Sequence, residues 1–192
     1  MTRTSTQRVQ SSGHGPRDAL TLARIAAGDL GELGTLYDRY AADILRFVTR
    51  VGGASLAEDV VQAVFVRVVT LAGGYNPQAP SARPWLFGIA VRILREQRRS
   101  LRRWTSALFE LGQHRRELSA APSEGTSDLE RAVAQLSVAK RTVLLLIEVE
   151  GFSCPEVASI LALPVGTVWT RLHHARQGLH LELAAIRERG VS

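Results

Sequence analysis

The sequence is poor in the residues that build covalent or metal-stabilised scaffolds. Its 192 residues contain one cysteine, Cys154, which excludes a disulfide scaffold and a cysteine-rich zinc site. The five histidines are scattered without the spacing of metal ligands. No apolar run approaches the roughly 20 residues that a bilayer-spanning helix needs, and residues 1–17 have no apolar core like that of a secretory signal. We therefore expect a protein of the reducing cytoplasm that is not inserted in a membrane.

Motifs of the common catalytic sites are also missing. The sequence has no Walker loop and no GxGxxG motif, and the acids on its predicted helices do not stand at a catalytic spacing from a histidine or serine. We expect no enzymatic activity, no metal or cofactor and no small-molecule substrate. Lysine is nearly absent as well, since only Lys140 among the 24 basic residues is a lysine, and the net charge is +6. Arginine forks suit phosphate and guanine better than ammonium groups do, so this balance favours a nucleic-acid partner.

Apolar residues recur at steps of three and four along most of the chain, and no strand pattern is present. Helical segments are predicted over residues 18–27, 32–51, 55–72, 81–104, 128–149, 154–161 and 164–187. Capping-box patterns open three of them, at residues 55–58, 127–130 and 153–156. In the segment that Ser81 caps, Pro84 falls in the first turn, where a proline is tolerated.

The predicted fold is all-α, with two small helical domains joined by a flexible linker. Residues 1–17 are expected to be a disordered tail, and residues 18–104 the first domain. The composition of residues 105–127 is typical of a linker, because the helical periodicity is lost and Pro, Gly and Ser gather near its end. Residues 128–192 are expected to form the second domain, which contains a helix-turn-helix.

The helix-turn-helix pattern lies between Ser153 and Arg176. Ala158 is small where two helices would cross closely, and Val168 follows ten residues later, where a second helix would pack back on the first. The second helix would expose hydrogen-bonding side chains and an aromatic ring suited to base edges and phosphates, namely Thr167, Trp169, Thr170, Arg171, His173, His174 and Arg176. The pattern favours DNA binding, with an ordinary αα-hairpin as the alternative.

A row of arginines marks the end of the fourth predicted segment. Arg92, Arg95, Arg99 and Arg102 share one helical face, flanked by Arg98 and Arg103, and Glu96 is the only acid among them. A solvated face normally mixes charges of both signs, so this row favours binding of a phosphate backbone. Tyr75, Trp85 and Trp104 lie near the row in sequence and are candidates for stacking on unpaired bases, although we expect Trp85 in the core.

Two blocks of residues resemble the conserved domains of extracytoplasmic-function (ECF) sigma factors. The first block comprises residues 36–40, 57–65 and 84–90, and the second comprises residues 136–153, 156–161 and 164–176. Both blocks stand in the family's order, and the resemblance covers about residues 18–185. It implies a transcription initiation factor that binds core RNA polymerase and directs it to promoter DNA.

The resemblance also implies roles for particular residues. In the family, the helix that carries Asp59, Gln62 and Phe65 here docks on the coiled coil of the polymerase β′ clamp. The loop over residues 75–83, together with Arg92, Arg95, Glu96 and Arg99, would read the −10 element as single-stranded DNA. The last helix would enter the major groove of the −35 element, and the apolar helix around residues 143–147 would pack in its domain and against the β flap.

The sequence departs from the family's pattern at several of these positions. Ala63 stands where Glu is usual, and Arg92 and Glu96 stand where Asn and Asp are frequent. Trp169 and His174 replace residues that are usually basic, which predicts weaker phosphate anchoring and an altered −35 sequence. Trp169 would contact DNA through its apolar face, with packing against its own domain as the alternative. An anti-sigma protein is the expected regulator, able to hold this otherwise nucleoid-associated protein at a membrane.

Two other functions remain open at this point. A sigma mimic sequesters an anti-sigma protein, but such a protein could lose the basic rows that this sequence keeps. A plain helix-turn-helix repressor would leave residues 18–104 unexplained and would call for a palindromic operator. Transcription from a selected promoter with added core polymerase distinguishes a sigma factor from both.

Overall fold

The computed structural model describes residues 14–110 and 127–189, with the side chains of residues 102–110 and of Arg189 left out. Within these ranges every regular element is helical and none is a strand, so the all-α prediction is confirmed. The α-helices are α1 (Gly15–Ala26), α2 (Glu32–Gly52), α3 (Ala57–Leu71), α4 (Arg83–Glu110), α5 (Asp128–Gln135), α6 (Val138–Leu144), α7 (Cys154–Leu161) and α8 (Val165–Arg189). Among the described helices, none combines the length and apolar character that a bilayer span requires.

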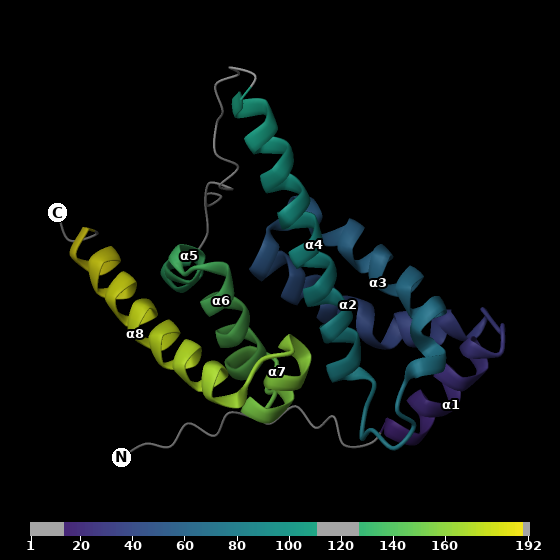
Figure 1. The fold of residues 1–192 in the computed structure, drawn as a ribbon. Helices are drawn as coiled ribbons and strands as arrows, with labels where there is room; N and C mark the ends of the chain where they lie inside the picture. The colour runs from purple at the N-terminus through teal and green to yellow at the C-terminus, as the bar shows by residue number, and fades with distance from the viewer. Residues whose placement is uncertain (1–13, 111–126, 190–192) are drawn as a thin grey trace, which may run out of the picture.

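The helices form two groups that meet along one side (Figure 1). Helices α1–α4 make the first group, from which the end of the long α4 projects, and α5–α8 make the second. Helix α7 lies at the base, between α4 and α8, and packs against α4. From this base α4 and α8 diverge, so the ends of the two longest helices lie apart.

Apolar side chains on the faces that the periodicity marks hold the first group together. Leu36, Ile44 and Phe47 of α2 are fully buried, and they share a core with Val64 of α3. The rings of Phe47 and Phe87 lie 5.1 Å apart and join α2 to α4. Full burial of such a side chain contributes about 1.5–3 kcal/mol, so these contacts outweigh surface ion pairs in fixing the bundle.

The second group is built around Val143, Leu146, Val157 and Leu172, all buried. Both capping boxes predicted here are confirmed. At Ser153, for example, the backbone N–H donates to the Glu156 carboxylate at 2.7 Å while the serine hydroxyl accepts from the Glu156 N–H. In the box at residues 127–130 the hydrogen bonds from the backbone and side chain of Ser127 lower the pKa of Glu130.

Three predicted helix boundaries are wrong. Helix α1 begins at Gly15, so residues 15–17 do not belong to a disordered tail, and Pro16 is accommodated in the first turn. Helix α4 runs on to Glu110, past the predicted end of the domain at residue 104. The capping box at residues 55–58 does not form: a 3-10 turn (Ala54–Leu56) precedes α3, and no described side chain caps that helix.

The helix predicted over residues 128–149 is broken at Leu136, whose backbone is extended. Arg141 stabilises the break, because its guanidinium donates to the carbonyls of Val133, Ala134 and Leu136 at the end of α5. After α6 the chain widens into a π-helical turn (Leu145–Val149), which ends at Gly151 in the left-handed region (φ 75°). Sequence periodicity shows neither feature, since it reports apolar faces and not the hydrogen bonds of a capping arginine or the widening of a turn.

The two groups share one continuous apolar core, which the linker prediction did not anticipate. The ring of Phe87 on α4 lies 5.2 Å from the ring of Phe152, at the start of the segment that leads into α7. A β-carbon on Gly88 would be 3.7 Å from the carbonyl oxygen of Ile160, so the α4 backbone passes close to α7. The first half of the chain therefore carries a docking face for the second.

Candidate nucleic-acid interface

Helices α7 and α8 have the helix-turn-helix geometry that the sequence predicts. Helix α7 ends at Leu161, and Ala162 takes a left-handed conformation (φ 52°) that reverses the chain. The N–H of Leu163 donates to the carbonyl of Ala158 at 3.0 Å, which closes the turn. Val168 is fully buried where α8 packs back on α7, and so the outer face of α8 is set at a fixed angle to the domain.

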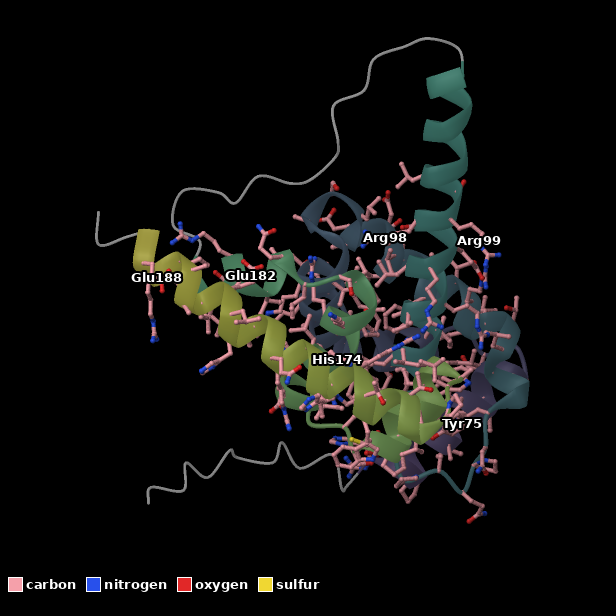
Figure 2. The ribbon with its side chains drawn as sticks, turned by 60° about the vertical axis from the view of Figure 1, so that its left-hand side comes forward. Tyr75, Arg98, Arg99, His174, Glu182 and Glu188 are labelled. Carbon is pink, nitrogen blue, oxygen red and sulfur yellow. The ribbon has the colours of Figure 1, made fainter. Side chains whose placement is uncertain are left out.

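The predicted reading face of α8 is largely open to solvent. Trp169 is 57% exposed, which rules out the alternative that it is packed inside its own domain. Thr170, His173, His174 and Arg176 are exposed, while Thr167 and Arg171 are half-buried. Figure 2 labels His174 midway along α8, between the turn and the end of the helix, where Glu182 and Glu188 are labelled.

Two of these side chains already have partners within the protein. The hydroxyl of Thr170 donates to the carbonyl of Gly166 at 3.0 Å, one turn back along α8. Arg176 donates to the Glu148 carboxylate at 2.9 Å through its Nε atom. The imidazole rings of His173 and His174 face each other edge to face at 5.5 Å. Arg171, Trp169 and the two histidines are the side chains with most freedom to meet a ligand.

The arginine row on α4 is only partly a free surface. Arg92, Arg95 and Arg99 are exposed, and Figure 2 shows Arg98 and Arg99 on different sides of the helix. Arg95 donates to the carbonyl of Leu161 at 3.1 Å, at the end of α7. The side chains of Arg102, Arg103 and Trp104 lie outside the described residues. Glu96 accepts from Arg67 of α3 at 2.8 Å, so its carboxylate is already paired with a cation.

Arg95 also connects the two predicted reading surfaces. Burial against α7 lowers the pKa of Arg95, and repulsion from Arg171 on α8 lowers it further. One cation of the −10 surface and one of the −35 surface therefore sense each other's charge in this arrangement. A phosphate placed between them would relieve that repulsion.

The loop between α3 and α4 differs from its prediction in one respect. Tyr75 is 8% exposed and its ring meets Trp85 edge-on at 5.4 Å, so Tyr75 belongs to the core and is not free to stack on a base. Its burial raises the pKa of the phenol. Trp85 is half-buried against the core, as expected. The loop exposes Asn76 and Gln78 instead, and the Asn76 side chain accepts from the Gln78 N–H at 3.0 Å.

The α3 residues proposed to meet a protein partner fall into two kinds. Asp59 and Gln62 are exposed, but Phe65 is 4% exposed, with its ring 4.8 Å from that of Tyr37. Phe65 therefore supports the helix from inside the core. Val66 and Val69 continue the Asp59–Gln62 face by steps of four and three, and Val66 is 68% exposed. Sequence reasoning passed over these valines, although their position out of phase with the core marks them as surface residues.

A buried ion pair joins the two halves at the base of α4. Arg83 donates through Nη1 to the carbonyl of Glu150 at 2.8 Å, and through Nη2 to the carboxylate of the same residue. The guanidinium carbon lies 4.8 Å from the ring centre of Phe87 and 4.7 Å from that of Phe152. Burial raises the pKa of Glu150, against the opposing pull of Arg83. Arg83 is thus committed to holding the halves together and is not part of the exposed loop.

Comparison with known proteins identifies the family that shares this arrangement of helices. The model for sigma-70 region 2 matches residues 36–105, and the model for sigma-70 region 4 matches residues 126–179. The ECF RNA polymerase sigma factor SigL of Mycobacterium tuberculosis is 34% identical over 164 residues, which cover 82% of this chain and 92% of SigL. The chain belongs to the ECF sigma factors. CarQ of Myxococcus xanthus, another RNA polymerase sigma factor, is 31% identical over 149 residues, or 75% of this chain and 84% of CarQ.

Solved structures share the fold of this sigma factor. RpoE of Bartonella quintana, solved in complex with the anti-sigma factor NepR, aligns with a TM-score of 0.65 and 22% identity, over 79% of this chain and 96% of RpoE. CnrH, solved with the cytosolic domain of CnrY, aligns with a TM-score of 0.64 and 25% identity, over 88% of this chain and 97% of CnrH. Sigma factors act in transcription initiation. A plain helix-turn-helix repressor is excluded, because the sigma-70 region 2 model matches residues 36–105.

Proposed function

We propose that this sigma factor binds core RNA polymerase through the outer face of α3 and reads promoter DNA with α4 and α8. The observation that carries the proposal is that different kinds of exposed side chain lie on different helices. Asp59, Gln62, Val66 and Val69 form one exposed stripe on α3, while α4 exposes Arg92 and Arg99, and α8 exposes hydrogen-bonding side chains that include Arg176. A protein interface needs an apolar centre with polar neighbours, and a nucleic-acid interface needs cations. The α3 stripe and the α4 and α8 faces meet these two requirements separately.

Regulation and location form part of the same proposal. An anti-sigma protein is the proposed regulator, and the complexes of RpoE with NepR and of CnrH with CnrY support it by analogy. When released, the sigma factor would act in the cytoplasm at the nucleoid, bound to polymerase and promoter DNA. Its two reading surfaces gain effective concentration once the polymerase fixes their spacing.

Polymerase binding is tested by Asp59→Ala combined with Gln62→Ala. Each substitution removes a polar contact at the proposed interface. The amount of core polymerase that co-purifies with the variant is therefore expected to fall about tenfold or more. Thr35→Ala with Asp38→Ala on α2 is the matched control. It also removes one exposed neutral polar side chain, the Thr35 hydroxyl, and one exposed carboxylate, that of Asp38. Wild-type recovery of polymerase by the Asp59 and Gln62 variant would remove α3 from the interface.

The −35 assignment is tested through His174 and Trp169 on α8. His174→Arg and Trp169→Arg each add a cation at a position that is usually basic in the family, so each is expected to raise affinity for duplex DNA, and Trp169→Arg is also expected to relax selectivity. Affinity is measured on −35 duplexes by fluorescence anisotropy, with Glu182→Gln as the control. If neither arginine variant changes affinity or selectivity, then α8 does not read the duplex with this face.

A further inference from the structure

A fully buried carboxylate ties the first helix to the loop before α4. Asp18 on α1 accepts hydrogen bonds from Arg39 and from the Tyr40 hydroxyl on α2, the latter at 2.6 Å. It also accepts from the backbone N–H of Ala82 at 2.9 Å. A buried carboxylate is tolerated only where such donors satisfy it, so the three groups are held together by one side chain.

The bond to Ala82 is made at a sensitive place. Ala82 immediately precedes α4, where helix N–H groups lack partners inside the helix and the dipole favours a negative charge. The N–H of the next residue, Arg83, donates to the Ser81 hydroxyl at 3.1 Å. Asp18 therefore caps α4 from a different helix, 64 residues away in sequence.

The loop over residues 75–82 is fixed on the same side by close backbone contact. A β-carbon on Gly15 would lie 2.5 Å from the carbonyl oxygen of Pro80, so α1 approaches the loop as closely as glycine allows. At its other end the loop is anchored by Tyr75 against Trp85. Between these anchors Asn76 and Gln78 are exposed.

We propose that Asp18 is a positioning residue for promoter reading: it holds the loop over residues 75–82 in the shape in which its exposed tip meets the opened −10 strand. This inference rests on the proposed reading of the −10 element by that loop. Asp18 itself is too deeply buried to touch DNA and acts only through Ala82 and its neighbours. Helix α1 thereby becomes part of the promoter-reading machinery, although the sequence gives it no DNA-binding residue.

The test compares Asp18→Asn with Glu32→Gln. Both replace a carboxylate in a contact between α1 and α2 by its amide, but Glu32 accepts from the exposed Arg24 and is not bonded to the loop. In Asp18→Asn, amides of residues 76–82 are expected to exchange hydrogen faster. Binding of holoenzyme to a single-stranded −10 oligonucleotide, taken from a promoter selected by the wild-type holoenzyme, is expected to weaken about fivefold. Glu32→Gln should change neither, and core polymerase binding should be equal in all three proteins.

Gly15→Ala provides a second, independent perturbation. Alanine favours the helix more than glycine does, so α1 itself should be stabilised. Its methyl group would nevertheless collide with the Pro80 carbonyl and displace the loop without any change of charge. The same weakening of −10 binding is expected, with unchanged affinity of the isolated protein for a −35 duplex.

Titration of Tyr40 reports whether the network has been broken. Burial, and then the hydrogen bond to Asp18, raise the pKa of Tyr40 to about 12. Ultraviolet titration of Asp18→Asn should therefore show an earlier tyrosine ionisation than in wild type. If Asp18→Asn exchanges and binds the −10 strand like wild type, the proposal is wrong.

A purely structural role for Asp18 gives a different result. If polymerase, −35 and −10 binding all fall together in Asp18→Asn and Gly15→Ala, Asp18 stabilises the domain and positions nothing. The exchange measurement needs neither polymerase nor DNA. Faster exchange of residues 76–82, combined with failure of wild-type holoenzyme to bind any −10 strand, would thus sustain the anchor while rejecting the proposed function of the loop.

Discussion

Arg83→Met is expected to loosen the packing of the two halves by about 3–5 kcal/mol at neutral pH, because it leaves the buried carboxylate of Glu150 without its partner. The wild-type guanidinium holds both a side-chain and a main-chain oxygen of Glu150 and lies against the rings of both Phe87 and Phe152. Methionine keeps much of the apolar volume, so the loss is that of the charge and its hydrogen bonds. Urea unfolding, with hydrogen exchange of residues 150–154, measures the effect.

The Arg83→Met effect should depend on pH in a defined direction. Burial raises the pKa of Glu150 in the folded protein, and removal of Arg83 takes away the main opposing influence. A carboxyl whose folded-state pKa is raised favours folding below the unfolded pKa, and that contribution is lost as the pH rises through the folded value. Arg83→Met should therefore recover stability on acidification, and addition of Glu150→Gln should restore it at neutral pH.

Arg131→Met is the matched control for this experiment. Arg131 pairs with Asp128 on the surface of α5, and a surface pair is worth about 0–1 kcal/mol. Equal stability of Arg83→Met and wild type at every pH would show that the ion pair does not hold the halves together.

Neutralising Arg92 and Arg99 together is expected to flatten the salt dependence of −10 strand binding. Both are exposed on α4, and each phosphate contact to a single strand contributes about 0.7 to the slope of log affinity against log salt. Arg92→Gln with Arg99→Gln should thus lower the slope by about 1.4 and weaken binding to all sequences alike. Binding isotherms of the holoenzyme between low and high salt measure this slope.

Arg131→Gln serves as the control for the arginine pair. Arg131 is an exposed cation on α5 that is bonded to Asp128, so its loss changes the net charge without removing a proposed phosphate contact. A slope unchanged in the Arg92 and Arg99 variant would mean that the row is only a solvated face.

The sequence predicted the local elements better than the contacts between them. Capping boxes at Ser127 and Ser153, and the buried Val168 of the helix-turn-helix, depend on neighbours within a few residues, and all three predictions are confirmed. The break at Leu136 depends on a guanidinium supplied from α6. That hydrogen bonding leaves no trace in periodicity, which reports only which face of a helix is apolar.

The same limit applies to the candidate site. Exposure of Asp59 and Trp169 follows from their phase on a helix and was predictable. The burial of Tyr75, the bond from Arg95 to α7 and the capping of α4 by Asp18 arise from elements far apart in the chain. A polar residue in a short helix, such as Asp18, looks like a surface residue until its partners from α2 and the α4 loop are placed around it.

Run-off transcription is the most direct test of the central claim. Core RNA polymerase is mixed with the wild-type protein and a randomised promoter library, and transcripts are sequenced to recover any selected −10 and −35 elements. We expect transcription that depends on this protein and on both elements. The Asp59→Ala and Gln62→Ala variant should lose all transcripts, whereas Trp169→Arg should still transcribe with relaxed −35 selection. Failure of the wild-type protein to direct core polymerase to any promoter would contradict the account.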